Sequence, residues 1–184
     1  MTVKEVVIFA AAQLGCREEV ENYITGKTAT DGKEKTMLLV QCFNIVENEL
    51  ALDYLPLHAE EELLTGTGKI NFSTLKNSVV RITGVTDSEG NALKFQLFPD
   101  YLSTSAGKVK ISYTYTPKTK KISDSSDYNL YLSPRLMGYG VAAECAMIEG
   151  LVEDAAFLDK KYRRALESLY RSTTGKRINS RRWV

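Results

Sequence analysis

The sequence predicts an α+β protein: a helical bundle formed by the N- and C-terminal helices, with an inserted antiparallel β-domain and an extended C-terminal tail. Apolar residues recur at helical spacing before residue 56 and again after residue 128. Between these parts, short alternating runs are separated by turn residues and have no helical pattern between them. A 184-residue chain that is 43% hydrophobic can form a core and carry an insertion. We expect N-terminal helices at 1–56, the β insertion at 57–127, C-terminal helices at 128–175 and the tail at 176–184.

The N-terminal part is expected to contain three helices. The capping-box pattern Thr2–Glu5 opens the first helix, and Gly15 ends it. A short helix over 17–24 follows, and a longer one over 31–54 ends before Pro56. One apolar stripe, widened by apolar neighbours, predicts that the long helix is largely buried: Leu39, Phe43, Val46 and Leu50, with Leu38, Cys42 and Ile45 beside them.

The central part is expected to form a meander of antiparallel strands. The segment 79–85 is rich in β-branched residues, and apolar and polar residues alternate clearly in 109–115. A third alternating run covers 93–97, and weaker strand patterns cover 57–64 and 69–72. The turn-rich gaps between these runs contain no helix, which favours antiparallel pairing.

The C-terminal part is expected to contain two helices. Ser133 followed by Pro134 is an N-cap with proline at the first helical position, and this helix runs to Glu149 before Gly150 breaks it. The last helix covers 152–172. Residues at helical spacing form the expected inner faces: Leu136, Tyr139, Ala143, Ala146 and Ile148 in the first helix, and Ala155, Leu158, Tyr162, Leu166 and Leu169 in the second.

Charge is distributed unevenly along the chain. The segment 160–184 carries nine Lys or Arg and one acid, a net charge of +8. The preceding 159 residues carry 15 bases and 22 acids, a net charge of −7. The only tryptophan, Trp183, is the penultimate residue. These features favour docking on a partner or on copies of the same chain.

Two groups of residues in this basic segment are candidate interaction sites. Arginines beside a tryptophan are typical of protein-interface hot spots, but the same combination can bind nucleic acid, and a terminus without function is a third interpretation. The tail candidates are Lys176, Arg177, Ile178, Arg181, Arg182, Trp183 and Val184. The other candidate is a basic helix face, formed by Lys160, Lys161, Arg163, Arg164 and Arg171. It would contact other subunits or line a channel. Alternatively, these cations are solvated and only complement the helix dipole.

No pattern of catalytic residues emerges from the sequence. The single histidine, His58, stands at the start of a predicted strand, where a surface residue is the ordinary interpretation. The segment 65–69 ends in Gly-Lys like a phosphate loop. However, Leu63 replaces the first glycine and Ile70 replaces the magnesium-binding Ser or Thr, so a hairpin turn is favoured.

Carboxylate clusters are equally weak evidence for a metal. Neither 60–62 nor the pair Asp124 and Asp127 has the spacing of an EF-hand, and adjacent glutamates in a strand point to opposite faces. We therefore expect solvated acids or an acidic docking face, with no metal, no cofactor and no enzymatic activity. An enzyme that works through Asp124 and Asp127 with a divalent metal is the alternative.

The cysteines bear on the compartment. Cys16, Cys42 and Cys145 are odd in number and widely spaced, which argues against a disulfide framework and a zinc site and fits a reducing environment. The apolar run 6–14 before Cys16 faintly resembles a lipoprotein signal. Gln13 stands where such a signal needs an aliphatic residue, so we expect none.

Several segments together resemble a known family. These are the helical stretch 39–50 (LVQCFNIVENEL), the β segments 80–91 and 109–117, and the C-terminal segments 136–151, 159–166 and 181–183. In the order of their elements and in local sequence, they resemble the head-to-tail connector (adaptor) proteins of tailed bacteriophages. Proteins of that family are helical bundles with a β insertion, and they assemble as rings of about twelve copies beneath the portal.

The resemblance implies a structural virion protein at the head-tail junction, made in the cytoplasm of the bacterial host. Its partners would be the portal protein, copies of itself, and tail or neck proteins, and genomic DNA would pass through the ring without sequence-specific binding. The tail at 176–184 would be the portal-docking arm, with Trp183 in an apolar pocket and Arg181 and Arg182 paired with acids. A tail-completion protein of the neck and a nucleic-acid-binding module that uses 160–182 are the alternatives.

Overall fold

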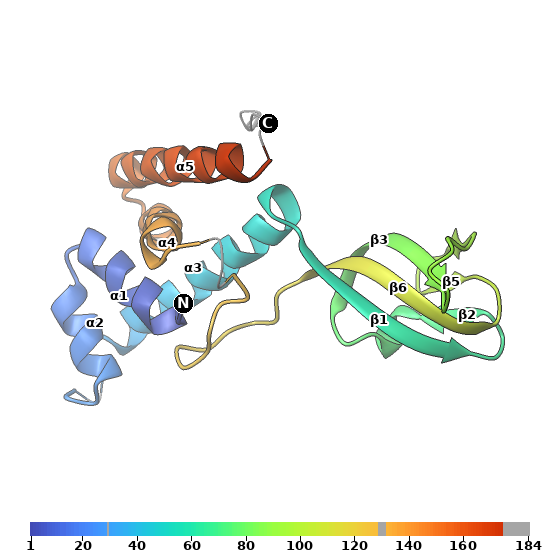
Figure 1. Cartoon of the computed structure of the whole chain (residues 1–184). Coiled ribbons are helices and arrows are strands. Elements are labelled where there is room, and N and C mark those ends of the chain that lie inside the picture. The colour runs from blue at the N-terminus through green and yellow to red at the C-terminus, as the bar shows by residue number, and fades with distance from the viewer. Residues whose placement is uncertain (29, 129–131, 175–184) are drawn as a thin grey trace. The chain divides into compact units, whose positions relative to one another are not determined.

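The computed structural model describes residues 1–28, 30–128 and 132–174, with side chains in the last helix described through Leu169. The protein is α+β, as the sequence predicts. It divides into two compact units: a helical unit made of Met1–Glu47 and the chain from Thr119 onward, and a β unit made of Asn48–Lys118 (Figure 1).

The helical unit contains the five α-helices, and α4 is its central element. α4 packs against both α1 and α5, and α1 also contacts α2. The bounds are α1 Val3–Gln13, α2 Arg17–Ile24, α3 Lys33–Glu49, α4 Pro134–Ile148 and α5 Val152–Thr174. A π-helical turn, Leu50–Tyr54, continues α3 into the β unit.

The predicted helix starts are confirmed. The Thr2 side chain accepts from the Glu5 amide at 3.2 Å, and the Glu5 carboxylate accepts from the Thr2 amide at 2.8 Å, which completes the capping box. The Ser133 hydroxyl accepts from the Leu136 amide, with Pro134 at the first helical position. Side chains thus satisfy amides that have no partner within the helices.

Small residues allow α4 to be surrounded by its neighbours. A Cβ at Gly138 would lie 2.3 Å from the Phe9 ring, and a Cβ at Gly140 would lie 3.0 Å from both Tyr162 and Val46. These glycines let α1, α3 and α5 approach the α4 backbone closely. The predicted inner residues of α4 and α5 are buried accordingly: Leu136, Tyr139, Ala143, Ala146, Ala155, Leu158, Tyr162 and Leu166.

The β unit contains two three-stranded antiparallel sheets. Their orders are β1-β6-β3 and β2-β5-β4, so the predicted antiparallel pairing is right and the predicted meander is wrong. The last strand pairs with both the first and the third, which a sequence pattern without register information does not indicate. The bounds are β1 Leu57–Thr65, β2 Lys69–Asn71, β3 Ser78–Asp87, β4 Gln96–Leu97, β5 Tyr101–Ser103 and β6 Gly107–Thr116, with a 3₁₀ turn at Phe72–Thr74.

The β unit has its own hydrophobic core. The inward residues Val109, Ile111 and Tyr113 of β6 are buried, as the alternating pattern predicts, and Tyr115 at the end of the alternation is partly buried. The cluster comprises Ile70, Leu75, Ile82, Val85, Leu102, Val109, Ile111 and Tyr113. Of the strand expected over 93–97, only Gln96–Leu97 pairs with another strand, because Leu93 and Phe95 pack at the edge of this cluster instead.

Two residues and two boundaries differ from expectation. Ile45 and Ile148 were expected inside and are exposed: Ile45 lies away from the buried stripe of α3, and Ile148 is the last residue of α4. The compact β unit covers 48–118, whereas the sequence pattern placed the insertion at 57–127. The segment 119–127 belongs to the helical unit because its backbone bonds to the N-terminus, including an amide–carbonyl bond from Val3 to Asp124 at 3.0 Å.

Candidate interaction surfaces

The candidate docking arm, Lys176–Val184, lies outside the described residues. Arg171 lies within α5, but its side chain also lies outside the described part. The remaining members of the basic face can be placed on α5.

The basic face of α5 divides into exposed and engaged side chains. Lys160 and Arg164 are exposed, one helical turn apart on the outer side of α5. The Arg163 guanidinium pairs with Asp159 at 2.6 Å, one turn earlier. The Lys161 ammonium lies 4.3 Å from the Phe157 ring centre and 5.2 Å from that of Tyr139, within the range of cation–π attraction. Two of the four described cations are therefore presented outward, and two are held against α4 and α5.

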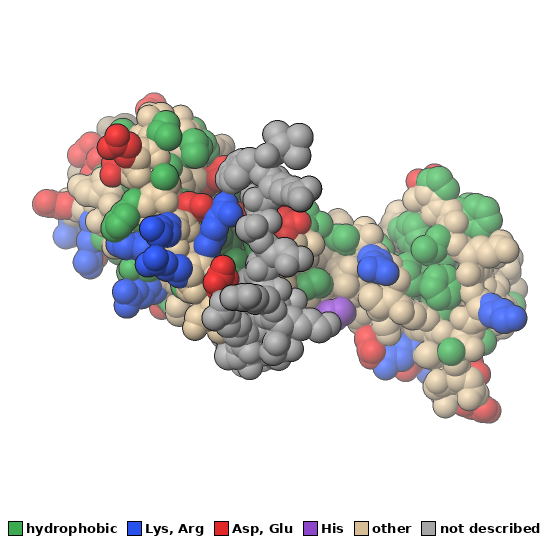
Figure 2. Space-filling model, turned by 90° about the horizontal axis from the view of Figure 1, so that it is seen from above, with side chains coloured by type: hydrophobic (Ala, Val, Ile, Leu, Met, Phe, Trp, Pro, Cys, Tyr) green, Lys and Arg blue, Asp and Glu red, His purple; other side chains and the backbone are tan. Residues whose placement is uncertain are grey.

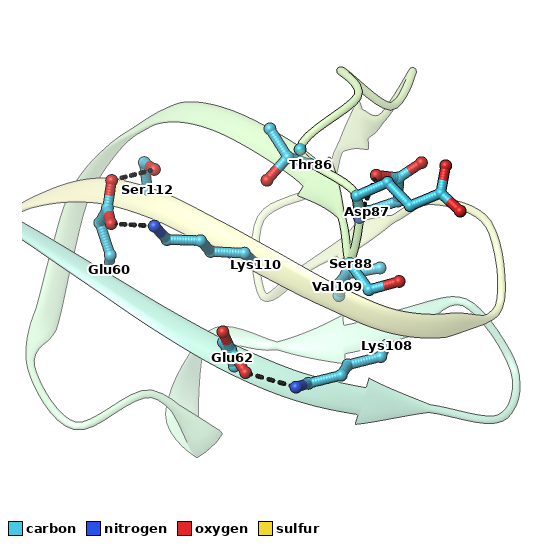
Figure 3. Close-up of a pocket in the computed structure, with 11 residues that line it drawn as sticks. Glu60, Glu62, Thr86, Asp87, Ser88, Lys108, Val109, Lys110 and Ser112 are labelled. Carbon is cyan, nitrogen blue, oxygen red and sulfur yellow. Dashed lines mark hydrogen bonds and ion pairs between the residues drawn. The ribbon is translucent and has the colours of Figure 1, made fainter.

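The outer face of the β1-β6-β3 sheet is polar and cross-linked by ion pairs. Glu60 pairs with Lys110, and Glu62 pairs with Lys108 at 2.7 Å (Figure 3). Bonds to Lys110 and Lys108 hold the pKa values of Glu60 and Glu62 below the ordinary range. The turn after β3 borders a cavity of about 530 Å³ beside these pairs. Since the pairs are exposed, their contribution to folding is small, and the face is a hydrated, charge-balanced surface.

Glu61, between these glutamates, points to the opposite side, as strand geometry predicts. Its carboxylate accepts a hydrogen bond from the buried Tyr113 hydroxyl and another from the Lys76 amide at 2.9 Å. Burial, together with the bond to Glu61, raises the pKa of Tyr113 to about 12. No sequence pattern indicates this bond, because it depends on the register that places Glu61 opposite Ile111, next to Tyr113 along β6.

Aromatic side chains are exposed at the β4–β5 turn. Phe98 stacks on Tyr101 with 4.5 Å between ring centres, and the Lys69 ammonium lies 4.0 Å from the Tyr101 ring centre. Leu97 beside them is exposed. Hydrophobic side chains also form the largest coloured area on the visible face of the β unit (Figure 2). An apolar patch of this kind is typical of a protein contact.

The segments considered for catalysis have structural places. His58 is an exposed residue of β1. The segment 65–69 joins β1 to β2, which belong to different sheets, so it is not the hairpin turn that the sequence favoured. Gly68 in this turn has φ 73°, and its carbonyl accepts from the Thr104 amide at 2.8 Å. The turn is thus a junction between sheets, stabilised from β5.

The acidic loop is tied into the helical unit. Asp127 pairs with Lys120 at 2.7 Å, and the Asp124 carboxylate accepts from the Lys121 amide at 2.7 Å. Asn44 on α3 exchanges two hydrogen bonds with the Lys120 backbone. Among the described residues, no three His, Cys, Asp or Glu side chains are grouped as a metal site requires.

Glu47 anchors the end of this loop and is almost fully buried. Its Oε1 accepts from the Ser126 hydroxyl at 2.6 Å and from the Asp127 amide at 3.0 Å. Its Oε2 is buried without a hydrogen-bond partner in the described structure. Burial raises the pKa of Glu47, because removal from water disfavours the charged form. No sequence pattern points to this role of Glu47.

Two of the cysteines, far apart in sequence, meet between α3 and α4. The Cys42 and Cys145 thiols are fully buried and hydrogen-bonded to each other. This bond, together with burial, raises the pKa of Cys42, which therefore stays protonated at neutral pH. The buried, protonated thiol of Cys42 thus behaves as a small apolar side chain in the core.

Comparison with known proteins finds no matching protein-family model and no matching curated protein. In the part of the chain that the structure describes, no helix has the length and apolar character needed to span a bilayer.

Proposed function

We propose that this protein is a head-to-tail connector of a tailed bacteriophage, a structural ring subunit that joins the portal to the tail. In this proposal the helical unit is the bundle that forms the body of the ring, and the β unit is the insertion that contacts the tail or a neighbouring copy. The observation that carries the proposal is α5, which presents Lys160 and Arg164 outward and leads into a basic segment ending in Arg181-Arg182-Trp183.

A ring needs contacts in which one surface of a subunit meets a different surface of the next. A chain with a net charge of −7 before residue 160 and +8 from residue 160 onward suits such pairing, because opposite charges steer and select the contact. Repetition around a ring also strengthens weak arms, since each arm after the first binds at a high effective concentration.

The arm is proposed to bind protein, because DNA must slide through a connector. Phosphate contacts made by many converging cations are tight and salt-dependent, and would hinder that movement. A tryptophan flanked by arginines instead matches the anchors of protein interfaces. The exposed apolar patch at the β4–β5 turn supports a second protein contact, with the tail or with a neighbouring copy.

Deleting Lys176–Val184 tests the arm. Portal binding should be lost while binding to duplex DNA stays unchanged. Trp183→Ala alone should weaken each arm by about 2 kcal/mol, the loss typical of a buried hot spot. Ser180→Ala is the control, since Ser180 lies in the same segment but is not one of the candidate docking residues, and it should change portal affinity much less. Equal portal binding by Trp183→Ala and the unchanged chain would refute the anchor.

A nucleic-acid-binding module is the second candidate, favoured by the exposed cations Lys160 and Arg164 on one side of α5. It predicts that the isolated protein binds DNA with a steep salt dependence, and that Lys160→Ala and Arg164→Ala each reduce the slope of log K against log salt by about one. DNA binding that is lost on removal of the arm, with portal binding retained, would establish this candidate instead.

A further inference from the structure

A cluster of large apolar side chains is exposed where α4 turns into α5. Met147, Ile148, Leu151 and Val152 are 50%, 53%, 46% and 61% exposed, within six consecutive residues. We call these four residues the apolar corner. Single exposed apolar residues are ordinary, whereas a contiguous group of this kind marks a surface that is covered by a partner.

The local fold explains the turn but does not require these side chains. Gly150 has φ 77°, and its amide bonds to the Met147 carbonyl while the Leu151 amide bonds to that of Ala146, which is the Schellman ending of a helix. Only the glycine is demanded by that backbone geometry. The buried faces of the two helices are supplied by other residues, such as Ala146 and Ala155. Of the four residues in the corner, only Leu151 holds a position where an apolar contact with the preceding turn often accompanies this ending, so the motif does not account for Met147, Ile148 and Val152.

Acidic residues border the apolar corner. Glu153 and Asp154 are exposed in the first turn of α5, and Glu149 pairs with Lys35 of α3. Acids at a helix start complement the helix dipole, which accounts for Glu153 and Asp154 in part. They also surround the apolar corner with negative charge, the arrangement of a hydrophobic interface centre with a polar rim.

The same helix carries the complementary surface. Phe157, Lys160 and Arg164 follow Glu153 at helical spacing on the outer side of α5, and all are exposed. We call these three residues the basic stripe. Phe157 is 60% exposed, and the alkyl stems of Lys160 and Arg164 add apolar area beneath their charged ends.

We propose that the apolar corner of one copy docks on the basic stripe of the next copy. This rests on the proposed function, and it assigns the two surfaces that join the ring. The corner would cover Phe157 and the alkyl stems, while Glu153 and Asp154 would pair with Lys160 and Arg164. The corner and the stripe are different surfaces, so in a ring each copy would turn its corner toward one neighbour and its stripe toward the other.

Complementary charge selects a second copy as the occupant of the corner. A rim of negative charge around apolar side chains fits a surface that combines an aromatic ring with cations. Such a surface is present on α5 of every copy, at equal concentration. If the corner bound a phage tail protein or DNA, there would be no reason for the charges of the corner to complement those of the stripe on the same helix.

A charge exchange between the two surfaces tests the proposal on the full-length chain. One variant carries Glu153→Lys with Asp154→Lys, and the other carries Lys160→Glu with Arg164→Glu. Each variant alone should self-associate at least about tenfold more weakly than the unchanged chain, because like charges then face each other. Mixing the two variants should restore assembly in alternating order, since every junction regains opposite charges.

Sedimentation velocity and native mass spectrometry provide the readout, with the protein alone and with portal rings. Leu151→Ser with Val152→Ser should weaken assembly without any charge change. Glu18→Lys with Glu19→Lys, a double reversal at exposed positions of α2, is the matched control and should leave assembly unchanged. Circular dichroism verifies that each variant retains its helices.

The outcomes separate this proposal from the connector function. Variants that still bind the portal through their arms but no longer associate with one another support both. Assembly that is unaffected by the charge reversals, failure of the mixture to assemble, or a closed dimer of the unchanged chain overturns the corner-to-stripe contact. Failure of the unchanged chain to bind the portal, with the variant mixture still restoring assembly, overturns the connector function and leaves the contact standing.

Discussion

The bond between Tyr113 and Glu61 offers the sharpest test of the β unit. Tyr113 is fully buried, and its hydroxyl donates to Glu61, which keeps a second bond from the Lys76 amide. Tyr113→Phe removes the donor and leaves the ring in place, so little cavity forms. A hydrogen bond to a charged acceptor contributes about 1.5–3 kcal/mol, and we expect the free energy of unfolding of the β unit to fall by that amount.

The assay must report on the β unit separately, because two compact units can unfold independently. Tryptophan fluorescence is unsuitable, since the only tryptophan is Trp183 in the tail. Hydrogen exchange of amides in β6, followed by mass spectrometry across a urea series, measures the unfolding of this unit directly. Tyr23→Phe makes the same chemical change in α2 and should alter stability by less than about 0.5 kcal/mol.

A double-mutant cycle isolates the bond from other effects of the change. In a Glu61→Ala background, Tyr113→Phe should cost less than in the unchanged chain, because the hydroxyl has then lost this acceptor and keeps only its bonds with Asn77. An equal loss of stability in both backgrounds, or no loss in either, would show that this bond does not hold the sheet together.

Three further predictions concern other parts of the structure. Burial raises the pKa of Glu47 above its unfolded value of 4.5. The stability that its protonated form contributes is therefore complete below pH 4.5 and is lost as pH rises through the pKa of the folded state. Urea unfolding of Glu47→Gln between pH 4 and 8 should lack this decline in the free energy of unfolding. The pKa of Tyr113 is raised to about 12, so in an ultraviolet titration Tyr113 should ionise at a higher pH than the exposed tyrosines. The free energy of unfolding should then decline between about pH 10 and 12. Gly68→Ala places a Cβ 2.1 Å from the Thr104 carbonyl oxygen at positive φ, and should destabilise the β unit by at least about 1–2 kcal/mol in the same exchange assay, whereas Gly66→Ala, which meets no close atom, should not.

The sequence was most informative where a local rule determines structure. The capping box at Thr2 and the Ser133-Pro134 start are set by backbone amides that need partners, and both helix starts were predictable. The buried stripe of α3 and the alternation in β6 follow from the periods of helix and strand. The residues of the stripe itself are buried, whereas Ile45 beside it is exposed.

The misses share a dependence on tertiary contacts. The order β1-β6-β3 depends on long-range strand pairing. The position of 119–127 in the helical unit depends on hydrogen bonds to Asn44 and Glu47. The contact between Cys42 and Cys145 depends on how α3 packs on α4. Among the candidate sites, the basic character of α5 could be predicted, because charge is a property of composition. The apolar corner could not, because exposure of Ile148 depends on which side of α4 its neighbours cover.

The most direct test of the connector function is the mass of the complex formed with the portal. The full-length protein, mixed with its cognate portal ring, should give one discrete species in native mass spectrometry, with about twelve copies bound per portal. A protein that ignores the portal, stays monomeric and binds DNA would contradict the connector function and support the nucleic-acid-binding module.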